Sequence, residues 1–261
     1  MCASLKGRTV LITREQKQAQ IFAKQIVSRG GVPLEAPLLR IQCTCTEAKT
    51  KQHVPFNQYD WLFFTSANGV HCFFQAVQAY GVDLSVLKNV HIAAVGPKTD
   101  AAIQAYGLKS AFIPSVYNAD TMTAEFLPQA EHKSRILLIQ GNWSRQILPD
   151  FFTAQSLEFD VLEAYETSID ASAADNLNAV LKTKRIDFLT FTSPSTVSAF
   201  VSMADQMLYS LEDDVCVCIG TTTEHKARAL GFKHILTPKQ FTIDGMLNEM
   251  TAYIERMEDN G

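Results

Sequence analysis

Short apolar runs alternate with longer segments of mixed polarity along the chain. The runs of the first half have the length and the β-branched or aromatic content of buried strands, and they occupy residues 9–13, 32–37, 61–65, 90–95 and 111–113. The segments between them have the spacing of amphipathic helices, beginning near Glu15, Asn68, Pro97 and Ala119. Strict alternation of strands and helices predicts a parallel sheet with helices on both faces.

The sequence also repeats itself. Residues 59–73 (YDWLFFTSANGVHCF) match residues 186–200 (IDFLTFTSPSTVSAF) without a gap, and the match includes Asp60 with Asp187 and Ser66 with Ser193. The register continues with a slightly shorter offset through Gly96 and Gly220, and residues 8–13 have a fainter counterpart at 135–140. Two copies of one structural unit therefore predict two similar domains, each a small doubly wound parallel sheet.

The repeat leaves the domain boundaries open. The domains can be contiguous halves of the chain, or the first strand–helix–strand element of each copy can be exchanged with the other copy. Exchange requires two chain crossings, and residues 38–44 and 167–173 are short stretches without a helical pattern. The pattern permits either arrangement.

Length, composition and charge exclude several classes of function. At 261 residues the chain has room for two domains of about 130 residues. The net charge of −4 is spread without a basic block, so nucleic acid is a poor candidate partner. No apolar run approaches the roughly 18 residues of a membrane span, and the N-terminal residues do not resemble a secretory signal. A cytoplasmic protein without membrane contact is expected.

The six cysteines suggest a metal site at first sight, because Cys43 and Cys45, and again Cys216 and Cys218, are separated by one residue. Cys216 and Cys218 lie in an apolar run, and no pair of histidines with ligand spacing accompanies either set. We expect buried apolar thiols and no metal site.

Candidate site residues lie where the predicted strands end, because ligands of open parallel sheets bind beyond the carboxyl ends of the strands, at helix N-termini. These loops are rich in small hydroxyl and amide residues that either cap the following helix or bind a ligand. Their recurrence in both copies favours two rims of donors that bind an anion with many carboxylates. The expected binding residues are Arg14, Thr65, Ser66, Ala67, Asn68, Gly96, Lys98, Thr99, Gly141, Arg145, Ser193, Pro194, Ser195, Gly220, Thr222 and Thr223.

Familiar catalytic and nucleotide-binding motifs are missing from the sequence. It has no GxxxxGK[ST] loop, no GxGxxG and no GxSxG elbow. Chemistry without a nucleotide, a metal or a conventional nucleophile is therefore expected.

An ordered set of motifs resembles the uroporphyrinogen-III synthase family over nearly the whole chain. The motifs are LITR (11–14), FTSANGV (64–70), AAVGPKT (93–99), LEAYET (162–167), FTSPSTV (191–197) and CIGTTT (218–223). Thr221 departs from the proline that is more frequent in the family at this place, whereas its counterpart Pro97 retains it.

The resemblance implies two flavodoxin-like domains joined by two chain crossings, with residues 1–38 and 169–261 in one domain, 39–168 in the other, and the substrate in a cleft between them. It implies that hydroxymethylbilane, a linear tetrapyrrole with many carboxylates, loses water and closes to uroporphyrinogen III with inversion of ring D. No cofactor is expected.

Tyr165 matches the family's tyrosine at the domain crossing and is the expected catalytic residue, because a neutral phenol can donate a hydrogen bond to the leaving oxygen. Arg14, Lys98 and Arg145 are candidates for pairing with substrate carboxylates.

The resemblance also implies an oligomeric state and a partner, and two other functions remain as alternatives. A monomer is expected, with transient contact to the preceding enzyme of the pathway. The main alternative is a non-enzymatic two-lobed binding protein for a polyanionic small molecule, since fold alone does not give function. A second alternative is an enzyme with another substrate, such as a sugar-phosphate transferase, and the missing phosphate loop disfavours it.

Overall fold

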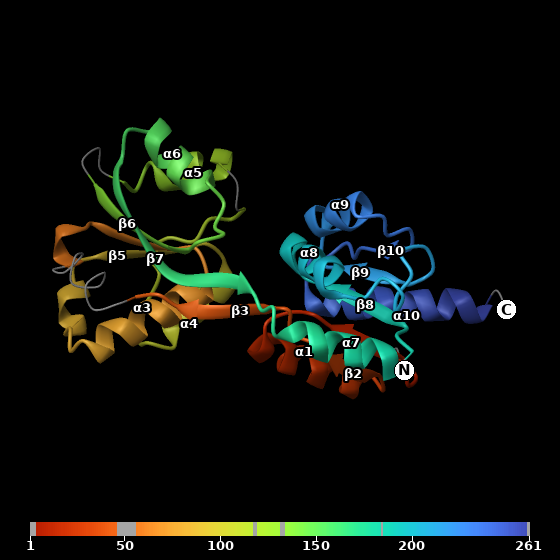
Figure 1. Ribbon diagram of the computed structural model, residues 1–261. Coiled ribbons are helices and arrows are strands. Elements are labelled where there is room, and N and C mark those ends of the chain that lie inside the picture. Colours follow the sequence, from red (N-terminus) through yellow and green to blue (C-terminus); the bar gives the residue numbers. More distant parts are fainter. Residues whose placement is uncertain (1–3, 46–55, 117–118, 131–133, 184, 260–261) are drawn as a thin grey trace. The chain divides into compact units, whose positions relative to one another are not determined.

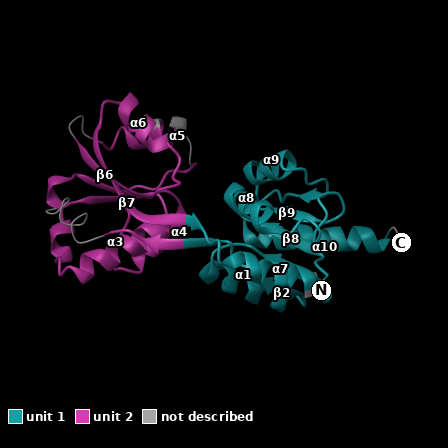
Figure 2. Cartoon of the chain, viewed as in Figure 1, with its two compact units in different colours: residues 1–40, 168–261 teal, residues 41–167 magenta. Residues whose placement is uncertain are grey.

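The computed structural model describes residues 4–45, 56–116, 119–130, 134–183 and 185–259. The chain divides into two compact units (Figures 1 and 2). Unit 1 consists of residues 1–40 and 168–261, and unit 2 consists of residues 41–167. The chain therefore passes from one unit to the other twice, once within β3 (Leu39–Cys43) and once within β7 (Glu158–Ile169).

Unit 1 contains a parallel sheet with the strand order β10-β9-β8-β1-β2. Its strands are β1 (Thr9–Ile12), β2 (Val32–Glu35), β8 (Phe188–Phe191), β9 (Cys216–Cys218) and β10 (Ile235–Leu236). Its helices are α1 (Gln16–Ser28), α7 (Ala173–Thr183), α8 (Pro194–Met203), α9 (Thr221–Ala229) and α10 (Ile243–Asp259).

Unit 2 contains a sheet with the order β3-β7-β6-β4-β5, in which β7, β6, β4 and β5 are parallel to one another. Its other strands are β4 (Trp61–Phe64), β5 (His91–Ala94) and β6 (Arg135–Gly141). Its helices are α3 (Ala67–Ala79), α4 (Pro97–Gln104), α5 (Ala119–Phe126) and α6 (Ile147–Ala154), with short 3-10 turns η1 (Phe56–Gln58) and η2 (Leu84–Leu87).

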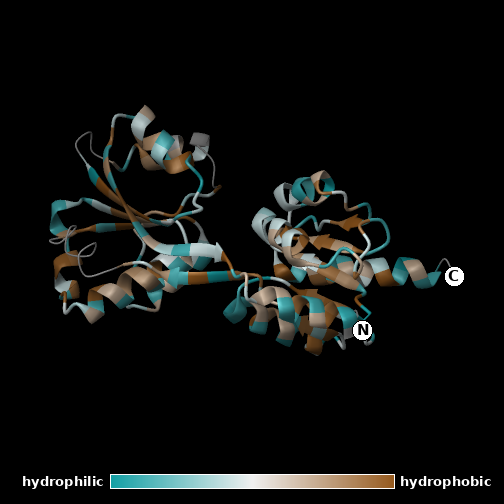
Figure 3. Ribbon diagram, viewed as in Figure 1, coloured by the Kyte–Doolittle hydropathy of each residue, from teal (hydrophilic) through white to brown (hydrophobic). Residues whose placement is uncertain are grey.

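The central strands β1, β8 and β9 of unit 1 and β4 and β6 of unit 2 are buried on both faces, which explains their continuous apolar runs. In β4, Leu62 and Phe64 pack with α3 and α4, whereas Trp61 and Phe63 pack with α5 and α6. In unit 1, one face of the sheet packs with α1 and α10 and the other with α7, α8 and α9. Figure 3 shows the hydrophobic colouring concentrated on these central strands. The α/β class with two largely parallel sheets, predicted from the alternation of elements, is confirmed.

Each sheet combines strands from both copies of the repeat. β1, from the first copy, pairs with β8 from the second, and β4 from the first copy pairs with β6 from the second. The repeated aspartates lie at these seams. The Asp187 carboxylate accepts the backbone N–H of Thr9 at 2.7 Å, and the Asp60 carboxylate accepts that of Arg135 at 2.7 Å. Each aspartate thus anchors the first residue of the neighbouring strand.

One expected strand is wrong. The run at 111–113 forms only an isolated bridge, between Phe112 and Ala93. Pro114 directly follows the run and has no N–H with which to extend a ladder, and the Phe112 ring is buried against Phe63 and Phe126.

Candidate functional site

The carboxyl ends of the strands in each unit carry a group of loops that lead into helices. We call them the unit 1 rim, residues 13–15, 192–195 and 220–223, and the unit 2 rim, residues 65–68, 96–99 and 141–145. The unit 1 rim follows β1, β8 and β9, and the unit 2 rim follows β4, β5 and β6. Because parallel strands end at one edge of their sheet, the structure brings the expected binding residues of each unit together at that edge.

Two serines of the rims cap helices. Ser66 accepts the backbone N–H of Gly69 at the start of α3, and Ser193 accepts that of Thr196 at the start of α8, in a capping box. Gly96 and Gly220 are the N-cap residues of α4 and α9, and neither helix has a side-chain cap. Uncapped N–H groups at a helix start are available to an anion.

Tyr165 lies in β7 beside the unit 2 rim, at the place where β7 runs along the end of β6. The pairing of β6 with β7 shifts by one residue between Gln140 and Gly141, so that Gly141 is opposite Tyr165. The hydroxyl of Ser66 donates to the phenol oxygen at 2.9 Å. The half-buried Tyr165 side chain therefore joins the start of α3 to the end of β6.

The three candidate cations differ in environment. Lys98 and Arg145 are exposed, whereas Arg14 is half-buried and its guanidinium donates to Gln18. Burial lowers the pKa of Arg14, and the neighbouring Glu15 carboxylate partly opposes this. Within the described part of the chain, the buried Nε of Arg14 has no hydrogen-bond partner. A buried guanidinium N–H of this kind is suited to a carboxylate ligand.

Thr99 and Thr223, two of the expected binding residues, have buried side chains. They occupy the first turns of α4 and α9 with 4% and 3% exposure. The third position of each helix turns the side chain towards the sheet, which buries both hydroxyls. Their neighbours Lys98 and Thr222 are exposed instead.

Most of the remaining expected residues are partly exposed. Gly141 and Gly220 are buried, and Thr65, Ser66, Ala67, Asn68, Gly96, Ser193, Pro194 and Ser195 are partly exposed. The Thr65 hydroxyl donates to the Ile139 carbonyl at 3.3 Å, which ties the end of β4 to β6.

Two aromatic residues were missed by the sequence analysis. Trp143, in the unit 2 rim, is 49% exposed, and Phe241, in the loop between β10 and α10, is 58% exposed. The Phe241 ring lies close to Gly220, where an added Cβ would come within 3.2 Å of it. A large aromatic side chain in a polar rim loop, as in GNWSR at 141–145, is the signal that could have identified Trp143.

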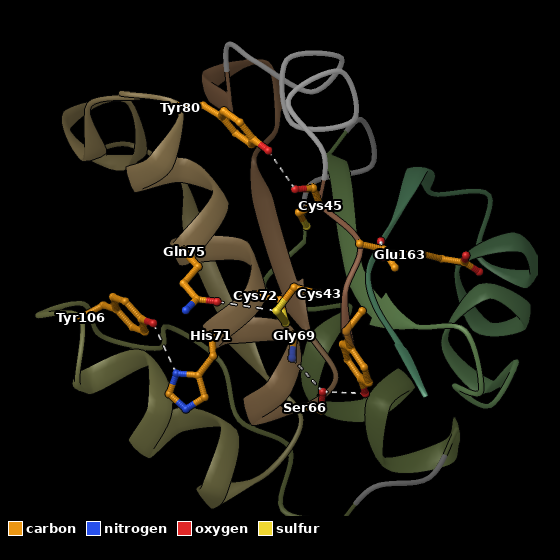
Figure 4. The surroundings of a disulfide bond; sticks show 12 residues. Cys43, Cys45, Ser66, Gly69, His71, Cys72, Gln75, Tyr80, Tyr106 and Glu163 are labelled. Carbon is orange, nitrogen blue, oxygen red and sulfur yellow. Dashed lines mark hydrogen bonds between the residues drawn. A yellow bond between two sulfur atoms is a disulfide. The ribbon is translucent and has the colours of Figure 1, made fainter. Parts of the chain in front are cut away.

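The cysteine expectation is partly wrong. Cys43 in β3 and Cys72 in α3 form a disulfide, shown in Figure 4. Their sequence separation is 29, so no local spacing indicated the pair. Cys216 and Cys218 are buried thiols as expected, and Cys2 lies outside the described residues. Among the described side chains, no group of three or more histidine, cysteine or acidic residues is placed to hold a metal ion.

Unit 1 also has a hollow of about 570 Å³ at the opposite edge of its sheet. It is lined by residues that precede the strands, including Arg8, Asp187 and Asp214. Arg8 is paired with Asp187 at 3.2 Å, and burial raises the pKa of Asp214. Because this hollow is at the amino-terminal edge of the strands, it is separate from the unit 1 rim.

No helix in the described ranges is both long and apolar enough to cross a bilayer.

The parallel sheets and their rims place the chain among the α/β proteins in which ligands bind at the carboxyl ends of strands. The chain belongs to the uroporphyrinogen-III synthase family, because the family model described as "Uroporphyrinogen-III synthase HemD" matches residues 20–248.

The names of individual proteins that are similar to the chain agree with this family assignment. A porphyrin biosynthesis protein HemD of Ruminiclostridium josui is 26% identical over 94% of the chain, which spans 48% of that protein's length. A putative uroporphyrinogen-III synthase of Methanocaldococcus jannaschii is 27% identical, over 95% of this chain and 99% of that one. The solved uroporphyrinogen-III synthetase of Helicobacter pylori has the same fold, with a TM-score of 0.67 at 19% identity over 95% of this chain and 99% of that one. A mutant uroporphyrinogen III synthase from Thermus thermophilus has a TM-score of 0.66 at 19% identity, over 96% of this chain and 99% of that one.

Proposed function

We propose that the protein is a cyclising lyase that converts hydroxymethylbilane to uroporphyrinogen III, with loss of water and inversion of ring D. The observation that carries the proposal is the Tyr165 hydroxyl beside the unit 2 rim, hydrogen-bonded to Ser66 at the start of α3, in a chain that belongs to this family. The comparisons give no support to the alternative of a non-enzymatic binding protein.

The proposed first step is departure of the hydroxymethyl oxygen. The phenol of Tyr165 gives its proton to this oxygen, the carbon–oxygen bond breaks, and water leaves. The electron pair of the adjacent pyrrole nitrogen is delocalised towards the carbon that has lost its oxygen, and this ring with its methylene carbon becomes an azafulvene cation. The substituted carbon of ring D attacks this cation to give a spiro intermediate, which fragments and recloses with ring D inverted. The proton lost when the product regains its aromatic pyrroles balances the one that Tyr165 donated.

The protein's second task is to hold a flexible chain in the conformation that closes. Orientation of reacting groups can contribute several kcal/mol to catalysis. We propose that both rims bind carboxylates of the same substrate molecule, through uncapped N–H groups, hydroxyls and cations. The buried Nε of Arg14 and the exposed Lys98 and Arg145 supply the positive charge. The exposed Trp143 offers an aromatic face on which a pyrrole ring can stack.

We propose that each unit is flavodoxin-like, supported in unit 1 by the order β2-β1-β8-β9-β10, which has the doubly wound 2-1-3-4-5 pattern. In this pattern ligands bind where the strand order reverses, beside β1 and β8 in unit 1 and beside β4 and β6 in unit 2. We also propose a cytoplasmic monomer that needs no cofactor and contacts the preceding enzyme transiently.

Product analysis tests the function. Purified protein is incubated with hydroxymethylbilane, without added metal or nucleotide, and the type I and type III isomers are separated by chromatography after oxidation. The type III isomer is expected, with heat-denatured protein giving the spontaneous type I product. A type I product from the native protein, or loss of activity with a chelator, would refute the proposal.

A further inference from the structure

The hydrogen bonds around Ser66 have a defined direction. The Ser66 oxygen accepts the Gly69 N–H at 3.1 Å, and its single proton is directed to the phenol oxygen of Tyr165 at 2.9 Å. The phenol oxygen is therefore an acceptor from the protein, so its own proton remains available for another acceptor. Ser66 thus determines which way the Tyr165 hydroxyl points.

Gly141 leaves the space that the Tyr165 ring occupies. A Cβ added at Gly141 would lie 2.4 Å from the ring carbon Cζ and 2.9 Å from the phenol oxygen. Real contacts of this kind are not that short, so any side chain at this position would displace the ring. The ring packs directly against the backbone at the end of β6.

Asn142 holds the backbone that follows Tyr165. Its side-chain oxygen accepts the N–H of Thr167 at 2.9 Å, and its side-chain nitrogen donates to the carbonyl of Thr167 at 3.1 Å. The backbone N–H of Asn142 also donates to the carbonyl of Tyr165 at 3.3 Å. These bonds continue the pairing of β7 beyond the last residue of β6, where the register has shifted. Shifts of this kind re-aim side chains near active sites.

We propose that Ser66, Gly141 and Asn142 are positioning residues that form a cradle for Tyr165 and direct its proton to the leaving group. Their catalytic consequence rests on the function proposed above, whereas their effect on the Tyr165 ring does not. Ser66 then acts through Tyr165 rather than by binding a substrate carboxylate. A phenol held by these contacts loses little orientational freedom when the reaction occurs, which is how preorganised groups accelerate a step.

A double-mutant cycle with Tyr165→Phe tests this role. Ser66→Ala is expected to lower kcat about tenfold with KM nearly unchanged, which is only part of the 10²- to 10⁴-fold contribution of general-acid assistance, because the phenol is still present. If Ser66 acts through the phenol, Ser66→Ala causes no further loss of kcat in the Tyr165→Phe background. Ser193→Ala is the matched control, because it removes the equivalent helix cap in unit 1, and its effect should combine independently with that of Tyr165→Phe.

Two further variants separate positioning from helix capping. Ser66→Asp keeps an excellent cap but cannot donate to the phenol, so it should retain the thermal stability of the wild type and still lose kcat. Ser66→Thr keeps the hydroxyl and should restore most of kcat. Gly141→Ala should lower kcat in the wild type and leave it unchanged in the Tyr165→Phe background.

A structural readout distinguishes failure of the cradle from failure of the proposed function. In protein labelled with ¹³C at tyrosine Cζ, the Tyr165 resonance, assigned from Tyr165→Phe, should move in Ser66→Ala and Gly141→Ala. It should not move in Ser193→Ala. Movement of the resonance together with a type I product would refute the function and support the cradle. The cradle would be overturned if Ser66→Ala and Tyr165→Phe affected kcat independently, or if Ser66→Ala raised KM and left kcat unchanged. It would also be overturned if Ser66→Asp had wild-type kcat or if the resonance did not move.

Discussion

Opening of the Cys43–Cys72 disulfide should destabilise unit 2 selectively. Cys43→Ser removes the cross-link at its exposed end and leaves the buried Cys72 in place. The bond closes a loop with a sequence separation of 29 residues, for which the chain-entropy estimate is about 3–4 kcal/mol. With a urea m-value of about 1–3 kcal/mol/M, the unfolding midpoint of unit 2 should fall by at least about 1 M.

Tryptophan fluorescence is the appropriate assay, because both tryptophans, Trp61 and Trp143, belong to unit 2. A reducing agent should shift the wild-type midpoint to that of Cys43→Ser and leave the variant unchanged. An equal midpoint for oxidised wild type and Cys43→Ser would refute the reasoning. A shift caused by the reducing agent in the variant would do the same, because it would assign the effect to another group.

Three further predictions concern catalysis, binding and pH. Tyr165→Phe should lower kcat on the order of 10²-fold with little change in KM, measured by steady-state kinetics; wild-type turnover to the type III isomer would make Tyr165 a packing residue. Arg14→Gln should raise KM several-fold more than it lowers kcat, since it removes a charge that binds ground-state carboxylates, and an unchanged KM would argue against that contact. Asp187→Asn should destabilise unit 1 near neutral pH. Desolvation raises the pKa of Asp187, but hydrogen bonds from Thr9 and the pairing with Arg8 outweigh it and lower the pKa below its ordinary value. The stabilisation is therefore complete above the unfolded pKa near 4 and is lost as the pH falls through the lower folded pKa, so denaturation midpoints of the two proteins should converge in acid.

Much of the fold could be predicted because its determinants are local. Apolar runs marked the central strands, and the polar loops after them marked the starts of α3, α4 and α8. The repeated Asp60 and Asp187 were visible in the sequence, but their function was not, since each acts on a strand far away in the chain. Whether strands of the two copies share a sheet depends on pairing between distant segments, which periodicity does not report.

The candidate site could be predicted only as a set of positions. Alternation places Thr99 and Thr223 after a strand, yet the helical phase turns their hydroxyls inward. The contact of Tyr165 with Gly141 depends on a one-residue shift of register between β6 and β7, and no residue type announces such a shift. The Cys43–Cys72 bond likewise joins two elements that only the tertiary fold brings together.

The two passages of the chain also impose an order on its synthesis. Unit 2 is one continuous segment, residues 41–167, and can complete its sheet as soon as that segment has left the ribosome. Strand β1 must wait for β8, its neighbour in unit 1, while all of unit 2 is translated. At 5–20 residues per second this takes roughly 6–25 s. During that interval the apolar residues Val10, Leu11 and Ile12, fully buried in the finished protein, have no completed sheet to enter. The N-terminal segment of the nascent chain is therefore a segment that a chaperone would protect during this interval.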